Sequence, residues 1–143
     1  MEEELRQAAA AGQLDTIERL LRAGCNPNAF DELGVAALHH AAKHEALEVV
    51  ALLLSRGADV NAHDEQQIGE TPLGEVAATC SLALATLLIQ AGANPTLPGG
   101  MQQTALGRSA RRKRGDGPAV HRLLLAAAGS SARTPAKSST RHR

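Results

Sequence analysis

The sequence contains no tryptophan or tyrosine and a single phenylalanine, Phe30, among its 143 residues. Aromatic side chains bury much apolar surface per residue, so a core without them has to be assembled from leucine, isoleucine, valine and alanine. Alanine also occurs in runs, at residues 8–11, 41–42 and 77–78. These short side chains predict helices that pack closely together. The scarcity of aromatic rings also leaves almost no platform for stacking nucleic-acid bases.

Cysteine is almost as scarce, and Cys25 and Cys80 do not have the spacing of metal ligands. Isolated cysteines of this kind are typical of reduced thiols in a reducing compartment. Residues 2–4 are glutamates, where a secretory signal would be basic, and no apolar run approaches the length of a membrane span. We therefore predict a cytoplasmic protein without a membrane span.

Motifs of catalysis are absent as well. The sequence has no Gly-x-Ser-x-Gly elbow and no glycine-rich loop that ends in Gly-Lys-Ser/Thr. Glu65, Glu70 and Glu75 have no His or Lys in a partner pattern, and neither cysteine has an evident neighbouring base. We therefore predict that the protein is not an enzyme, with no catalytic residues and no cofactor.

Two histidines, His40 and His44, lie four residues apart on a predicted helix, a spacing that can place two imidazoles on one metal ion. His39 and His63 could lie near them. However, no His-Glu-x-x-His arrangement is present, and no Cys or third His has ligand spacing. We therefore predict no metal site and assign His40 and His44 to the surface.

Repetition dominates what the sequence does contain. The pentapeptide at residues 57–61 (Gly-Ala-Asp-Val-Asn) recurs in altered form at residues 24–28 and 92–96, which are 33 residues earlier and 35 residues later. Single leucines and pairs of apolar residues keep the same register; they are Leu5, Leu38, Leu73 and Leu106, and Leu20-Leu21, Leu53-Leu54 and Leu88-Ile89. Three independent markers with one period indicate a chain built from repeats.

This period, with an alanine-rich helix, a leucine-rich helix and a glycine-containing turn, resembles the ankyrin repeat, whose opening signature is Thr-Pro-Leu-His-x-Ala. Residues 71–73 (Thr-Pro-Leu) carry three of these positions and residues 38–41 (Leu-His-His-Ala) carry the rest. The resemblance implies an all-α solenoid of stacked helix-turn-helix units joined by projecting turns. It also implies that His39 bonds to turn backbone. The chain departs from the signature at Gly74, which replaces the histidine, and at residues 36–37, which are both alanine.

We expect four repeats, at about residues 3–30, 31–63, 64–98 and 99–128. The expected helices include residues 3–11, 14–22, 38–44, 47–55 and 120–128. The turn in residues 64–73 is two residues longer than its counterpart at 31–38, so we expect it to project further. Residues 111–118 are expected to run between the two helices of the last repeat, and the four basic residues in a row, 111–114, are expected to distort that repeat. Residues 129–143 are rich in Ser, Thr, Arg and Lys and are predicted to form a disordered basic tail.

A net charge of zero conceals an uneven distribution. Residues 1–103 contain 5 Lys/Arg and 14 Asp/Glu, whereas residues 104–143 contain 10 Lys/Arg and 1 Asp/Glu. Because stacked repeats keep their sequence order in space, one end of the solenoid should be acidic and the other basic. The basic third supports an alternative function, the electrostatic binding of nucleic acid or of an anionic membrane.

The function that the resemblance implies is protein–protein interaction, as a scaffold, adaptor or inhibitor and as a monomer. Such repeats bind partners through turn tips and the inner face of each first helix, and we expect the turn with Glu65 and Glu70, both solvated, to determine specificity. The predicted partner-binding residues are Glu32, Leu33, Val35, Lys43, His44, His63, Glu65, Gln66, Gln67, Glu70, Thr79, Arg111 and Arg112. Partner identity is not encoded in this pattern.

Overall fold

The computed structural model describes residues 2–64, 69–99, 102–113 and 115–140, with side chains as far as residue 129. Within these ranges the regular structure is helical, as the sequence predicts. The helices are α1 (Glu2–Ala11), α2 (Leu14–Arg22), α3 (Ala37–Lys43), α4 (Leu47–Ser55), α5 (Pro72–Val76), α6 (Leu82–Gln90), α7 (Ala105–Ser109) and α8 (Gly117–Thr140). Among the described residues, none of these helices has the length and apolarity needed to cross a membrane.

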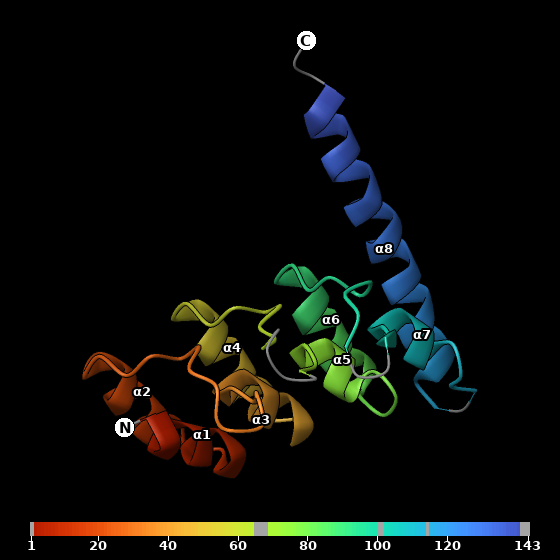
Figure 1. Cartoon of the computed structure of the whole chain (residues 1–143). Coiled ribbons are helices and arrows are strands. Elements are labelled where there is room, and N and C mark those ends of the chain that lie inside the picture. Colours follow the sequence, from red (N-terminus) through yellow and green to blue (C-terminus); the bar gives the residue numbers. More distant parts are fainter. Residues whose placement is uncertain (1, 65–68, 100–101, 114, 141–143) are drawn as a thin grey trace.

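Helices that occupy the same place in successive repeats lie side by side (Figure 1). The first helices, α1, α3, α5 and α7, form one layer, in which each contacts the next. The second helices, α2, α4, α6 and α8, form the other layer in the same way. The molecule is therefore a two-layer solenoid, in which the helices of each layer contact their counterparts in the neighbouring repeats.

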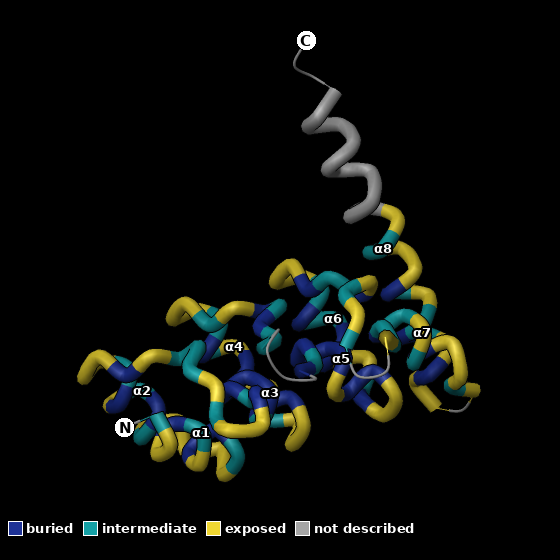
Figure 2. The backbone as a smooth tube through the Cα atoms, viewed as in Figure 1, coloured by how far each residue is buried: buried dark blue, intermediate teal, exposed yellow. Residues whose placement is uncertain are grey.

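The core lies between the two layers, where Figure 2 shows the buried residues. Leu38 and Leu73 from the first helices, and Leu53 and Leu88 from the second helices, have at most 1% of their surface exposed. These four repeated leucines of the sequence thus face inward. Ala41, at 0% exposure, shows how the alanines allow the helices to approach closely.

The glycine that opens each pentapeptide ends a second helix. Gly24, Gly57 and Gly92 have φ values of 98°, 95° and 101°, in the left-handed region that favours glycine. The amide that follows each of them bonds back to the last turn, as the Ala58 amide does to the Leu53 carbonyl at 3.0 Å. Helix termination therefore recurs with the period of the repeat.

The asparagine that closes the pentapeptide links one repeat to the next. Asn28 Nδ2 donates to the Gly57 carbonyl at 3.1 Å, and its Oδ1 accepts from the Asp59 amide at 2.7 Å. Asn61 makes the same two bonds, at 3.1 and 2.7 Å, to backbone 31 and 33 residues further along the chain. We call these four bonds the asparagine ladder; it holds the outer turns of the first three repeats in register.

In the last repeat, helix α7 ends at Ser109, so Arg111, Arg112 and Lys113 lie between its two helices. Helix α8 runs from Gly117 to Thr140, so helical backbone continues beyond residue 128, where we expected it to end. Alanine, arginine and lysine are good helix formers, and a helix that has already formed extends more readily than it nucleates. The division into a repeat domain and a tail stays a prediction.

Candidate functional site

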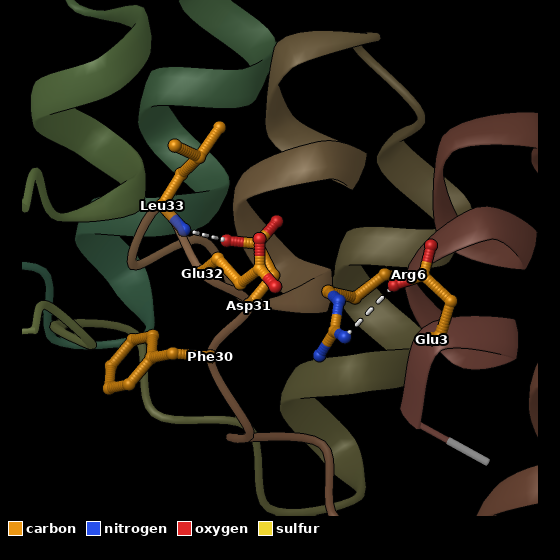
Figure 3. Close-up of a pocket in the computed structure, with 6 residues that line it drawn as sticks. All are labelled: Glu3, Arg6, Phe30, Asp31, Glu32 and Leu33. Carbon is orange, nitrogen blue, oxygen red and sulfur yellow. Dashed lines mark hydrogen bonds and ion pairs between the residues drawn. The ribbon is translucent and has the colours of Figure 1, made fainter.

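One hollow on the first-helix layer is formed by α1 and the turn of the second repeat (Figure 3). It has a volume of about 650 Å³ and is lined by Glu3, Arg6, Phe30, Asp31, Glu32 and Leu33. We call it the turn-tip hollow. Leu33 is 76% exposed and Phe30 is 36% exposed, so two large apolar side chains are open to solvent here.

The turn that carries Leu33 is fixed by Asp31. Its Oδ1 accepts hydrogen bonds from the amides of Leu33 at 2.8 Å and Val35 at 3.0 Å. Gly34 takes a φ of 77° to close the turn. Burial acts to raise the pKa of Asp31, but the amide hydrogen bonds from Val35 and Leu33 outweigh it, and the pKa is lowered overall. The carboxylate is therefore charged at neutral pH and keeps Leu33 in place.

The charged groups around the turn-tip hollow are predominantly acidic. Arg6 donates to the Ala29 carbonyl at 3.2 Å and to Glu3 at 3.1 Å, so its cation is already bonded. Glu3 and Glu32 are both exposed. The hollow thus combines an apolar surface with carboxylates at its edge.

Five further predicted partner-binding residues differ in their exposure. Lys43 and His44, at the end of α3, and Thr79, after α5, are exposed. Val35 and His63 are half-buried, and the His63 Nδ1 lies 2.9 Å from the Asn61 carbonyl oxygen. These positions are compatible with contact to a partner, and their role stays a prediction.

The long third turn differs most from expectation. Glu65, Gln66 and Gln67 lie outside the described residues. Glu70 was expected to be solvated, and this was wrong: its Oε2 accepts from Arg108 Nη2 at 2.6 Å, and the two side chains are only 17% and 21% exposed. Two glycines, Gly74 and Gly99, provide the space for this carboxylate, since a Cβ on either would press against Glu70 Oε1. A histidine at position 74, as in the signature, would therefore displace the Glu70 carboxylate from its ion pair with Arg108.

His39 anchors the same turn from the other side, as the resemblance implies. Its Nδ1 accepts from the Ala36 amide at 3.0 Å, so its Nε2 carries the proton and donates to the Glu70 carbonyl at 2.5 Å. Burial lowers the pKa of His39 and keeps the ring neutral. Burial also lowers the pKa of His40. We expected His40 at the surface, but it is half-buried.

The second hollow lies between the third and fourth repeats. It has a volume of about 580 Å³ and is lined by Ala78, Gln103, Arg108, Arg111 and Arg112. A neighbouring hollow of about 460 Å³ shares three of these residues and adds Lys113. We call the two together the arginine hollow. Arg112 Nη1 donates to the Cys80 carbonyl at 2.9 Å and to the Ala77 carbonyl at 3.3 Å, whereas Arg111 is exposed.

The sequence does not reveal the pairing of Ser109 with His121, because the two residues lie on different helices. Ser109 Oγ is 2.9 Å from His121 Nδ1, but it also donates to the Leu106 carbonyl, and Ser109 is 0% exposed. A substrate carbonyl cannot reach this hydroxyl, so the pair joins α7 to α8. Cys25 and Cys80 are buried, and burial raises the pKa of both thiols, which disfavours the nucleophilic thiolate.

Metal ligands do not gather in the described part of the chain: no three His, Cys, Asp or Glu side chains there are placed to hold an ion. His40 and His44, which have the appropriate spacing in the sequence, differ in their surroundings. His40 lies half-buried near Asp31, whereas His44 is exposed at the end of α3.

Known proteins resemble parts of this chain. Human ankyrin repeat and SOCS box protein 16 is 39% identical over 106 residues, which are 73% of this chain and 23% of that protein. Mouse RelA-associated inhibitor is 35% identical over 89 residues, or 62% of this chain and 11% of that protein. The palmitoyltransferase akr1 of Schizosaccharomyces pombe is 45% identical over 56 residues, or 38% of this chain and 9% of that enzyme. The chain thus spans less than a quarter of the length of each.

A family model for ankyrin repeats matches three copies within residues 5–99. This range covers the first three helix pairs apart from the first three residues of α1, and the fourth pair lies beyond it. Ankyrin repeats serve in general as binding modules for other proteins. Since the match extends over more than half of the sequence, the chain belongs to the ankyrin-repeat family.

Proposed function

We propose that this chain is a non-enzymatic module that binds a protein partner through the turn-tip hollow and the adjoining surface of the first-helix layer. The observation that carries the proposal is Leu33, which is 76% exposed at the tip of a turn held by two hydrogen bonds to Asp31. Single exposed leucines are common. Leu33, however, borders a hollow of about 650 Å³ that Phe30 also lines. A partner side chain can therefore bury apolar surface on a turn that is already ordered, which reduces the entropic cost of association.

The charge around the hollow specifies the partner further. Glu3 and Glu32 are exposed at its edge, and the Arg6 cation is bonded to Glu3 and to backbone. A partner segment should therefore present an apolar side chain flanked by lysine, arginine or other hydrogen-bond donors. This role replaces the specificity that the sequence assigned to Glu70, whose carboxylate is paired with Arg108.

The absence of catalysis is part of the same proposal. Two features support it: the Ser109 hydroxyl is inaccessible beside His121, and burial raises the pKa of both thiols. The monomeric state and the cytoplasmic location stay predictions.

Affinity capture tests the proposal. The immobilised chain is incubated with native cell extract, the retained protein is identified, and its affinity for purified variants is measured. Leu33→Gln should weaken binding at least about tenfold, as loss of an interface hot spot does. Leu47→Gln is the matched control, because Leu47 is 36% exposed but belongs to α4 in the second-helix layer. Equal affinities for the two variants would contradict the proposal.

A further inference from the structure

The arginine hollow contains positive charge that the described residues do not neutralise. Arg111 and Lys113 are exposed, and no described residue accepts a hydrogen bond from either side chain. The lining of the hollow includes three arginines, a lysine, a glutamine and an alanine, and no carboxylate. Of these cations, Arg108 alone has a carboxylate partner, Glu70.

The two inner arginines are already held in place. Arg112 is bonded to the carbonyls of Ala77 and Cys80, and Arg108 donates to the Gly74 carbonyl at 3.1 Å as well as to Glu70. A guanidinium has five N–H donors, so these bonds leave further donors for a ligand. Because the side chains are ordered before binding, an anion that enters the hollow does not have to immobilise them.

We propose that the arginine hollow binds the carboxylates of an acidic segment of the protein partner. This inference rests on the proposed function, since the hollow lies on the same first-helix layer as the turn-tip hollow, two repeats further along. Arg111 and Lys113 supply the free charge, and the Arg112 guanidinium supplies oriented N–H donors with the fork geometry that suits a carboxylate. Ala78 lines both parts of the hollow, is exposed, and has a side chain of only one methyl group.

A peptide fits this hollow better than a nucleic acid does. Single-stranded nucleic acids are bound by aromatic stacking together with a basic groove. The one aromatic residue of the chain, Phe30, lies in the turn-tip hollow and not here. Residues 1–103 have nine more acidic than basic side chains, with 14 Asp/Glu against 5 Lys/Arg. A phosphodiester chain that extended from the hollow over the first three repeats would meet this negative charge, whereas a short acidic segment would not.

Fluorescence anisotropy with three labelled probes tests the inference on the full chain. The probes are a hexaglutamate peptide, a hexaglutamine peptide and a single-stranded oligothymidylate of the same net charge as the first. At physiological salt the hexaglutamate should bind at least about tenfold more tightly than the hexaglutamine, because charge complementarity provides the recognition. Tighter binding of the oligothymidylate than of hexaglutamate, or no preference between the peptides, would overturn the inference.

Charge-removing variants locate the site. Arg111→Gln combined with Lys113→Gln should weaken hexaglutamate binding at least about fivefold without a change in the thermal midpoint, since both side chains are exposed. Arg22→Gln is the matched control: it removes an exposed arginine at the opposite end of the solenoid and should leave the affinity unchanged. An equal loss in the control would show general electrostatic attraction and overturn the site. Leu33→Gln should not alter hexaglutamate binding. The proposal for the turn-tip hollow and the proposal for the arginine hollow can therefore fail independently of each other.

Discussion

The junction between the second and third repeats differs from the junction between the third and fourth. At the former, Asn61 bonds to the backbone of the next outer turn through neutral hydrogen bonds that repeat those of Asn28. At the latter, the equivalent residue is Thr96, which bonds to Asn94 within its own turn. Arg108 and Arg112 instead reach back to the third repeat across the first-helix layer.

This difference shows that side chains which attach the last repeat to the stack can also change the charge of the protein surface. The asparagine ladder lies in the outer turns and adds no charge. The arginines place cations on the first-helix layer, where Arg111 and Lys113 extend the positive surface into solvent. The charge asymmetry of the sequence is therefore partly structural, because Arg108 and Arg112 stabilise the last junction.

The largest expected effect comes from the apolar core that both junctions share. Leu53 is 0% exposed in α4, so Leu53→Ala should lower the free energy of unfolding by about 2–5 kcal/mol through lost burial and a cavity. Leu33→Ala should cost under about 0.5 kcal/mol, since Leu33 is 76% exposed. Chemical denaturation monitored by far-UV circular dichroism measures both. Comparable losses would mean that the leucine register is not the core register.

The arginine junction should be the next most sensitive. Arg108→Ala removes the ion pair with the Glu70 carboxylate, which is 17% exposed, and should cost about 1.5–3 kcal/mol. Arg22→Ala, which breaks an i,i+4 pair whose arginine is 72% exposed, should cost under about 0.5 kcal/mol. A double-mutant cycle with Glu70→Ala isolates the pair. A coupling energy near zero would show that Arg108 acts through its bond to the Gly74 carbonyl and not through Glu70.

These two predictions also mark the limit of what the sequence reveals. The repeated leucines and glycines place α2 and α4 at the bounds that the structure has, because termination and burial recur with a local period. Glu70 could not be assigned from the sequence. Its partner Arg108 is 38 residues away, and the space for the pair depends on the absence of side chains at Gly74 and Gly99. Contacts of this kind depend on how repeats stack, and a period alone does not specify them.

The asparagine junction should respond less than the arginine junction. Asn61→Ala removes two neutral hydrogen bonds to the next outer turn and should cost about 1–2 kcal/mol, near the sum of two typical bonds. Asn28→Ala removes the equivalent pair one repeat earlier and should cost about the same. Thermal and chemical unfolding of both variants measure this. A loss at Asn61 larger than that at Arg108 would reverse the order of the two junctions.

The smallest effect is expected at Thr96, where the ladder ends. Its hydroxyl donates to Asn94 Oδ1 at 2.7 Å, and the Thr96 amide donates to the same oxygen at 3.0 Å. Thr96→Ala removes the first bond and keeps the second, so the turn retains its shape. Because Thr96 is exposed, water can replace the lost partner, and the cost should be under about 0.5 kcal/mol. Thr96→Ala thus serves as the in-register control for Asn61→Ala, measured under the same denaturation conditions. If both variants lost the same stability, Thr96 would link the third and fourth repeats as Asn61 links the second and third, and the distinction between the two junctions would no longer hold.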